Sequence, residues 1–294
     1  MNSSNAYITL NNGVKMPALG LGVYQSKPEE TTEAVKTALD TGYRLIDTAA
    51  AYFNEREVGE GIRQSDIDRA DIFIETKLWI SDYGYDSALR AFDVSLKKLG
   101  IEQLDLWLLH QPLASEFDKT IQSYKAAEKL LSEGRVRAIG VSNLTPTELD
   151  RLITETDVVP AVNQIQVHPY YSQAEWRMAN ERYGILTQSW SPLGGSYTYN
   201  NAEKNPFIDN VITGIARKYY KTPAQVILRW HLDHGFSAIP KSVKPHRIAE
   251  NFDVFDFKLT KEEIEAIDAL ETGVRGGPDP DSLDLATYGF KIPD

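Results

Sequence analysis

The chain has 294 residues, of which 42% are hydrophobic and 25% are charged, and its formal net charge at pH 7 is −11. This composition is typical of a soluble globular protein, and the acidic balance argues against a basic surface that binds nucleic acid. Because the chain has no cysteine, disulfides, thiolate metal sites and a cysteine nucleophile are excluded.

The sequence shows no recognisable targeting or membrane segment. Residues 1–13, MNSSNAYITLNNG, lack the basic and apolar stretches of a signal peptide. No apolar run approaches the roughly 20 residues that a transmembrane helix needs. We therefore expect a cytoplasmic protein without a membrane partner.

The first structured segment, AYITLNNGVKMP at residues 6–17, places an Asn-Gly pair between alternating apolar residues. Such a pair favours the tight turn of a β-hairpin. Eight short apolar stretches, each typical of a buried strand, are spread along the chain from this segment onward. The predicted strands are 16–24, 43–47, 72–78, 104–110, 136–143, 161–167, 184–190 and 236–242.

Amphipathic helix patterns separate the predicted strands. Residues 29–42 and 85–100 carry apolar side chains at i, i+3 and i+4, and each stretch ends in glycine. A third pattern, at 222–235, begins with Thr222 as the N-cap and Pro223 at the first helical position.

Eight strand–helix units predict a parallel sheet that is covered by helices, and they close most simply into a (β/α)8 barrel of the TIM type. We expect one such domain over residues 1–294, with the hairpin capping the barrel floor. The alternative is a doubly wound sheet, but no G-x-G-x-x-G follows any strand. Residues 273–282, GVRGGPDPDS, are rich in glycine and proline and predict a loop that folds over the barrel mouth.

Three consecutive predicted strands finish at residues with chemically active side chains. The second ends at Asp47, the third reaches Lys77 and the fourth ends at His110, while Tyr52 follows in the loop after Asp47. In a (β/α)8 barrel the chemistry lies where the strands end. We therefore expect Asp47, Tyr52, Lys77 and His110 to converge at one mouth.

This set of residues suits the protonation of a carbonyl oxygen. A lysine ammonium lowers the pKa of a nearby phenol, and Asp47 would keep that lysine charged and oriented. A histidine beside the phenol can position a carbonyl oxygen. The chain offers no group to attack the carbonyl carbon, so a bound hydride donor is the natural candidate.

A cluster of cations follows the eighth predicted strand. Lys241, Lys244 and Arg247, together with Ser242, stand where a helix N-terminus directs backbone N–H groups at an anion. In an acidic protein this cluster predicts a phosphate site. His231 and His234, in contrast, lack the carboxylate pattern of a zinc protease, so no metal site is expected.

The chain resembles the aldo-keto reductases, and most closely the bacterial 2,5-diketo-D-gluconate reductases. The resemblance runs through nearly the whole chain and keeps its order. Its motifs are GYRLIDTAAAYFNEREVG (42–59), ETKLW (75–79), LDLWLLHQP (104–112), IGVSN (139–143), VNQIQVHP (162–169), SWSPLG (189–194) and IPKSVKPHRIAENFDVFDF (239–257).

This resemblance implies a barrel that binds NADPH without a Rossmann fold, and a monomeric enzyme. It implies that Tyr52 is the general acid, that Asp47 and Lys77 set its pKa and that His110 orients the carbonyl. The implied contacts of the cofactor are Gly22, Val23, Asp47, Ser142, Asn143, Gln164, Trp190, Ser191, Leu193, Gly194, Lys241, Ser242, Val243, Lys244, Arg247, Glu250 and Asn251.

The implied substrate pocket is lined by Tyr24, Trp79, His110 and Gln111. Many family members carry tryptophan where this chain has Gln111, so the pocket should be more polar on that side. The expected reaction is the NADPH-dependent reduction of small aldehydes, α-dicarbonyls, and keto-sugars or keto-acids such as 2,5-diketogluconate. Two alternatives remain: an NADPH-binding sensor without turnover, and a Schiff-base aldolase with Lys77 as the nucleophile.

Overall fold

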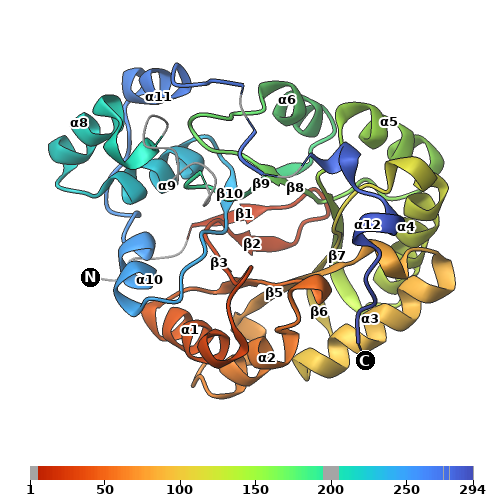
Figure 1. Cartoon of the computed structure of the whole chain (residues 1–294). Helices are drawn as coiled ribbons and strands as arrows, with labels where there is room; N and C mark the ends of the chain where they lie inside the picture. Colours follow the sequence, from red (N-terminus) through yellow and green to blue (C-terminus); the bar gives the residue numbers. More distant parts are fainter. Residues whose placement is uncertain (1–5, 195–204, 274, 278, 294) are drawn as a thin grey trace.

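The computed structural model describes residues 6–194, 205–273, 275–277 and 279–293. Eight parallel strands curl around one axis, helices lie outside them, and a separate antiparallel pair lies across one end (Figure 1). The strands of the curled sheet are β3 (Leu21–Gly22), β4 (Leu45–Asp47), β5 (Phe73–Leu78), β6 (Leu104–Leu109), β7 (Val136–Ser142), β8 (Val162–Gln166), β9 (Leu186–Trp190) and β10 (Ser237–Ala238).

The strands pair in chain order from β3 to β10, as a (β/α)8 barrel requires. Two isolated parallel bridges, Leu19 with Ala238 and Gly22 with Lys241, join the first strand region to the last. The described helices are α1 (Pro28–Thr41), α2 (Glu55–Arg63), α3 (Tyr85–Leu99), α4 (Phe117–Ser132), α5 (Pro146–Glu155), α6 (Ala174–Arg182), α8 (Asn210–Tyr219), α9 (Pro223–Asp233), α10 (Pro245–Phe252), α11 (Lys261–Asp268) and α12 (Leu285–Tyr288).

The hairpin predicted at residues 6–17 is present and closes the barrel floor. Strand β1 (Tyr7–Thr9) pairs antiparallel with β2 (Lys15–Pro17). Leu10 and Met16 are buried in one cluster with the inward-facing barrel residues Leu45, Phe73 and Leu106. The prediction of one long first strand at 16–24 is wrong, because Met16 and Pro17 belong to the hairpin and only β3 joins the barrel.

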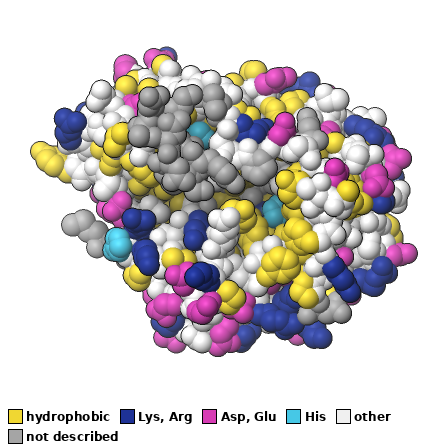
Figure 2. All heavy atoms as spheres, in the orientation of Figure 1, with side chains coloured by type: hydrophobic (Ala, Val, Ile, Leu, Met, Phe, Trp, Pro, Cys, Tyr) yellow, Lys and Arg dark blue, Asp and Glu magenta, His cyan; other side chains and the backbone are white. Residues whose placement is uncertain are grey.

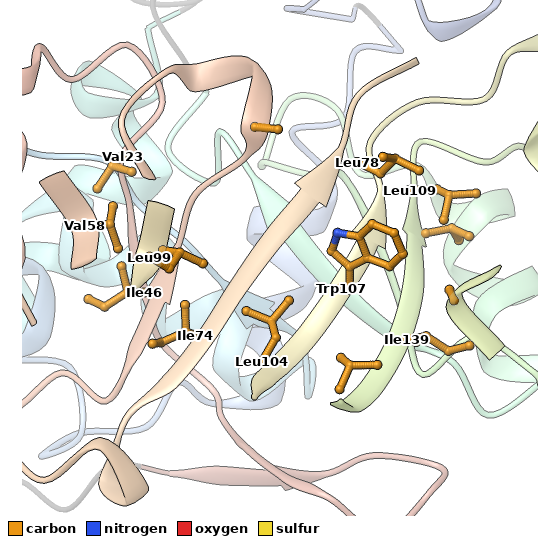
Figure 3. Packing of buried hydrophobic residues seen from close by; sticks show 14 of the residues in the cluster. Val23, Ile46, Val58, Ile74, Leu78, Leu99, Leu104, Trp107, Leu109 and Ile139 are labelled. Carbon is orange, nitrogen blue, oxygen red and sulfur yellow. The ribbon is translucent and has the colours of Figure 1, made fainter. Parts of the chain in front are cut away.

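The largest hydrophobic cluster fills the space between the barrel and its helices (Figure 3). Ile46, Ile74 and Trp107 point outward from adjacent strands and pack against side chains such as Val58 and Leu99 from α2 and α3. Every residue of β4, β5 and β6 is buried, and the polar side chains of β5, Glu75, Thr76 and Lys77, form hydrogen bonds within the protein.

The predicted helix boundaries agree with the structure to within two residues. At α9, Thr222 Oγ1 accepts a hydrogen bond from the backbone N–H of Gln225, Gln225 Oε1 accepts one from the backbone N–H of Thr222, and Pro223 opens the helix. At the end of α3, Gly100 takes the left-handed conformation with φ of 70° and ends the helix. None of the described helices is long and apolar enough to cross a membrane.

Candidate active site

The four predicted catalytic residues lie together at the end of the barrel where β4, β5 and β6 finish. Asp47 is the last residue of β4, and Lys77 is the penultimate residue of β5. Lys77 Nζ donates hydrogen bonds to Asp47 Oδ1 and, at 2.9 Å, to the backbone oxygen of Thr48. The ammonium also lies 5.1 Å from the centre of the Tyr52 ring, and the ring of His110 is 5.5 Å from that of Tyr52.

Local backbone structure explains how Tyr52 returns to the strand end. The chain makes a single 3₁₀ turn, η1 (Ala50–Tyr52), directly after β4, and Phe53 stops it in the left-handed conformation with φ of 56°. The buried side chain of Asn54 then accepts a hydrogen bond from Thr48 Oγ1 at 2.8 Å and donates one to the backbone oxygen of Val23 at 3.0 Å. This loop therefore holds the phenol beside the Asp47–Lys77 pair.

Tyr52 is a protonated phenol at neutral pH in this structure. Burial raises its pKa well above 10, and the negative charge of Asp47 raises the pKa further. This direction is opposite to the lowering that the sequence predicted. Burial is the largest cause and the Asp47 carboxylate the next, and the nearby Lys77 ammonium does not offset them.

His110 is a neutral imidazole in this site. Burial lowers its pKa well below 6.5, and the neighbouring Lys77 ammonium lowers it further. Its Nδ1 atom is buried and has no hydrogen-bond partner among the described residues. The Trp79 ring stands edge-on to it, at a centroid distance of 5.0 Å. A neutral imidazole in this position can exchange hydrogen bonds with a carbonyl oxygen without adding charge.

A hydrogen-bond network adjoins the catalytic group on β7, β8 and β9. Gln164 Nε2 donates to Asp47 Oδ1 at 3.0 Å, which links the predicted nicotinamide contacts to the catalytic pair. Ser142 Oγ donates to the backbone oxygen of Gln164 at 2.8 Å. Asn143 Oδ1 accepts the indole N–H of Trp190 at 2.9 Å. The structure therefore brings these four predicted cofactor residues together.

The remaining predicted contacts near the strand ends occupy two neighbouring segments. Gly22 and Val23 stand at the end of β3, where a Cβ on Gly22 would lie 2.8 Å from the backbone oxygen of Ile239. Ser191 follows β9 with φ of 47°, a left-handed conformation that glycine adopts more readily. Leu193 packs against the core, and the backbone N–H of Gly194 donates to Ser191 at 2.9 Å.

The predicted phosphate cluster leads from the end of β10 into the start of α10. The side chains of Lys241, Lys244 and Arg247 are exposed, and none of them forms an ion pair with a carboxylate within the described part of the chain. Partial burial lowers the pKa of Lys241. The negative charge of Glu30 opposes this shift, and the positive charge of Lys244 adds to it. These cations are therefore available to an anionic ligand beside a helix N-terminus.

The other predicted contacts in this region differ in their surroundings. Ser242 is buried and accepts a hydrogen bond from the backbone N–H of Lys244 at 3.1 Å, and Val243 packs on the core. Glu250 accepts a hydrogen bond from Thr222 Oγ1 at 2.9 Å, so part of its side chain supports the start of α9. Asn251 is buried in α10.

The predicted substrate residues line an aromatic wall to which the C-terminal segment contributes. Tyr24 is exposed, and its ring centre is 5.1 Å from that of Tyr52. Trp79 stacks on Phe290 at 5.1 Å, and its indole N–H donates to the backbone oxygen of Tyr288 at 2.9 Å. These contacts come from residues 288–290, which follow the segment 273–282 that was expected over the mouth. Within that segment, the backbone N–H of Gly277 donates to Gln166 Oε1 at 3.1 Å. In Figure 2, hydrophobic side chains gather near the middle of this face.

Gln111, at the position where many family members carry tryptophan, forms hydrogen bonds within the site. Its Oε1 accepts a hydrogen bond from Asn143 Nδ2 at 3.0 Å, and its backbone oxygen accepts one from Tyr83 at 2.6 Å. Gln111 therefore joins the pocket side of the site to the network around Trp190. His231 and His234 lie elsewhere: His231 is buried between Ser189 and Pro192, and His234 pairs with Asp268.

Two polar residues inside the barrel were not predicted from the sequence. Glu75 lies two residues before Lys77 on β5, and Gln188 lies two residues before Trp190 on β9. Gln188 Nε2 donates to both carboxyl oxygens of Glu75, at 2.8 and 3.1 Å. The two-residue period of a strand places Glu75 on the same face as Lys77, and this signal could have revealed it.

Comparison with known proteins agrees with this geometry. A model of the aldo/keto reductase family matches residues 17–272. Morphine 6-dehydrogenase from Pseudomonas putida is 53% identical over 293 residues, which cover 98% of this chain and 99% of that protein. A methylglyoxal reductase from Escherichia coli is 46% identical over 276 residues, or 94% of this chain and 97% of that protein.

A solved structure is similar over almost the same length. The crystal structure of an aspartate-to-alanine mutant of Gox0644 in complex with NADPH superimposes with a TM-score of 0.88. The two chains are 41% identical, and the match covers 96% of this chain and 99% of the other.

Proposed function

The chain belongs to the aldo/keto reductase family, and we propose from this premise that it reduces small carbonyl compounds to alcohols with NADPH. The observation that carries the proposal is the protonated phenol of Tyr52 beside the buried Lys77–Asp47 pair and the neutral imidazole of His110. This arrangement presents one proton donor and one neutral hydrogen-bonding group to a carbonyl oxygen.

Each of the four residues has a distinct role in the proposed reaction. NADPH supplies the hydride for the carbonyl carbon when it is bound. Tyr52 donates its phenolic proton to the carbonyl oxygen, and His110 holds that oxygen by a hydrogen bond. The Lys77 ammonium stabilises the phenolate that remains, while Asp47 keeps the ammonium fixed.

The residues present fit NADPH. Gln164, Ser142 and Asn143 would hold the nicotinamide carboxamide, and Trp190 would stack on the ring. The exposed cations Lys241, Lys244 and Arg247 would hold the 2′-phosphate, which NADH lacks. Their lack of carboxylate partners in the described chain supports this assignment, since each can pair with phosphate without giving up another ion pair.

The side chains near Tyr52 support the proposed substrate class. Trp79 and Phe290 provide an apolar side, whereas Gln111 and His110 provide polar groups. Such a wall suits small aldehydes, α-dicarbonyls, and keto-sugars or keto-acids, and a relative that is 46% identical is named a methylglyoxal reductase. The narrower assignment to 2,5-diketogluconate stays a prediction, as do a cytoplasmic location and a monomeric state.

The Schiff-base alternative is less well supported by the geometry. An aldolase lysine must reach the substrate as a free amine, but Lys77 is fully buried and donates to Asp47 and to Thr48. The sensor alternative predicts cofactor binding without turnover, and only an assay separates it from the proposed enzyme.

The experiment that tests the proposal is consumption of NADPH, and separately of NADH, with methylglyoxal and with a keto-sugar acid. Because one relative is named a dehydrogenase, oxidation of the alcohols with NADP⁺ is followed alongside. We expect turnover with NADPH that falls about 10²–10⁴-fold in Tyr52→Phe, the usual contribution of a general acid. Binding of NADPH without turnover of any of these substrates would favour the sensor, and no binding would remove the proposal.

A further inference from the structure

A directional chain of hydrogen bonds lies inside the barrel next to the catalytic pair. Gln188 Nε2 donates to Glu75 at 2.8 and 3.1 Å, and Gln188 Oε1 accepts from Gln164 Nε2 at 2.8 Å. Gln164 Nε2 also donates to Asp47 Oδ1 at 3.0 Å. All four side chains are at most 2% exposed, so solvent does not satisfy these groups in place of the protein.

The strand register places these four hydrogen-bonded residues opposite one another in pairs. Glu75 is the register partner of Asp47 on the neighbouring strand, and Gln164 is the register partner of Gln188. Registered residues of adjacent parallel strands face the same side of a sheet. Two acids and two amides therefore meet inside the barrel from β4, β5, β8 and β9.

The donors and acceptors of these hydrogen bonds run in one direction. Both oxygens of an ionised Glu75 only accept, and Gln188 Nε2 lies 2.8 and 3.1 Å from them, so Gln188 directs its donating nitrogen at Glu75. Gln188 Oε1 then faces Gln164 and accepts from its Nε2. Gln164 Nε2 therefore points into the barrel, towards Gln188 and Asp47, and none of the described residues donates to Gln164 Oε1.

We propose that Glu75 is a positioning residue which, through Gln188, fixes the amide of Gln164 so that it offers an oxygen, and not a nitrogen, to the ligand. The ligand group selected in this way is a hydrogen-bond donor, such as the N–H of a primary carboxamide. The inference rests on the proposed function, because nicotinamide carries that carboxamide. It adds a determinant of cofactor recognition that does not touch the cofactor and acts on the contact residue Gln164 through Gln188.

Electrostatics are consistent with this role. Burial raises the pKa of Glu75 well above 4.5, the charge of Asp47 raises it further, and Lys77 opposes the rise. A rise in this pKa favours protonation of Glu75, and a protonated carboxyl group still keeps an oxygen that accepts from Gln188.

The test compares two cofactors, of which only one has a hydrogen-bond donor on the nicotinamide substituent. The Kd values of NADPH and of its reduced 3-acetylpyridine analogue, in which an acetyl group replaces the carboxamide, are measured by the quenching of tryptophan fluorescence. One lost hydrogen bond should make the wild type prefer NADPH by about tenfold. In Glu75→Met, Gln188 is free to turn and Gln164 Nε2 keeps only its hydrogen bond to Asp47, so the preference for NADPH should fall by about threefold or more.

Two further variants and one control complete the design. Gln188→Met removes the hydrogen bond between Gln188 and Gln164 and should weaken the preference as well, which keeps the test valid if Glu75→Met does not fold. Glu75→Gln can still accept from Gln188 and should keep the preference. Glu55→Gln changes another buried carboxyl group, which accepts a hydrogen bond from Thr76 Oγ1 at 2.7 Å and takes no part in the Glu75–Gln188–Gln164 hydrogen bonds. This control should leave the preference for NADPH unchanged.

The outcomes separate the inference from the proposed function. If the wild type binds neither cofactor, the proposed function fails. If the wild type binds both cofactors equally, or if a folded Glu75→Met or Gln188→Met keeps the tenfold preference, the orienting role of Glu75 is wrong while the reductase assignment stands.

Discussion

Lys77 and Asp47 form an ion pair with side chains that are 0% and 2% exposed, at the meeting point of β4 and β5. Its burial means that each charge depends on the other, because neither can be solvated by water. The pair thereby couples the stability of the barrel to its chemistry, and the two effects can be separated by substitution.

Lys77→Met should lower the free energy of unfolding by about 3–5 kcal/mol, since it leaves the Asp47 carboxylate buried without a partner. The double variant Asp47→Asn/Lys77→Met removes both charges and should recover most of this loss. Neither variant should reduce a carbonyl compound. Urea unfolding measures the first effect and NADPH consumption the second. Equal stability of the single and double variants would show that Asp47 does not depend on Lys77.

Lys241→Ala and Arg247→Ala should each raise the Kd for NADPH by roughly 10-fold or more, because each removes a cation from the phosphate cluster. The Kd for NADH should change much less. Lys261→Ala, a change of an exposed lysine at the start of α11, serves as the control. Equal weakening of NADPH and NADH binding would place the 2′-phosphate elsewhere.

Phe290→Ala should raise the KM for the carbonyl substrate, because it removes the ring that stacks on Trp79. Phe290 belongs to the C-terminal segment, and no predicted cofactor contact lies there. The Kd for NADPH, measured by fluorescence in the absence of substrate, should therefore stay unchanged. A loss of NADPH affinity without a change in KM would contradict the assignment of this segment to the substrate pocket.

His231 should make the protein less stable as the pH falls from 7 towards 4. Burial lowers its pKa to about 3, below the ordinary value of 6.5. Between these values the unfolded chain binds a proton that the folded chain does not, so the free energy of unfolding falls with falling pH. The loss between pH 6.5 and pH 5 is about 2 kcal/mol.

The measurement for His231 is urea unfolding of wild type and His231→Asn at pH 7.5 and pH 5. The variant should be less stable at pH 7.5, since it loses the contacts with Ser189 and Pro192, but its stability should depend less on pH. Parallel pH profiles for the two proteins would show that another group titrates.

Strand order and the grouping of the candidate site could be predicted from the sequence because both depend on short-range patterns. Asp47, Lys77 and His110 lie at or near the ends of three consecutive predicted strands, and the geometry of a parallel barrel then brings them together. The first strand was misassigned because Met16 and Pro17 are as apolar as a barrel strand. Their partners on β1, which decide the matter, are set by the hairpin register.

The electrostatic state of the site could not be predicted in the same way. The direction of the Tyr52 pKa depends on how deeply the phenol is buried and on how close Asp47 lies, and the sequence contains neither quantity. The strand period could place Glu75 on the face of Lys77, but it could not show which residue Glu75 contacts. Its partner Gln188 is 113 residues away.

The junction between the first and the last strand of the barrel is also the place that the proposed cofactor would cross. Among the described residues two isolated bridges join the two sides there, and Gly22 and Lys241 form one of them. A ligand that contacts both sides of this junction stabilises it, because separating the first strand from the last would cost the binding energy of the ligand. Saturation with NADPH should therefore slow amide hydrogen exchange at Gly22 and its neighbours more than in the centre of β6.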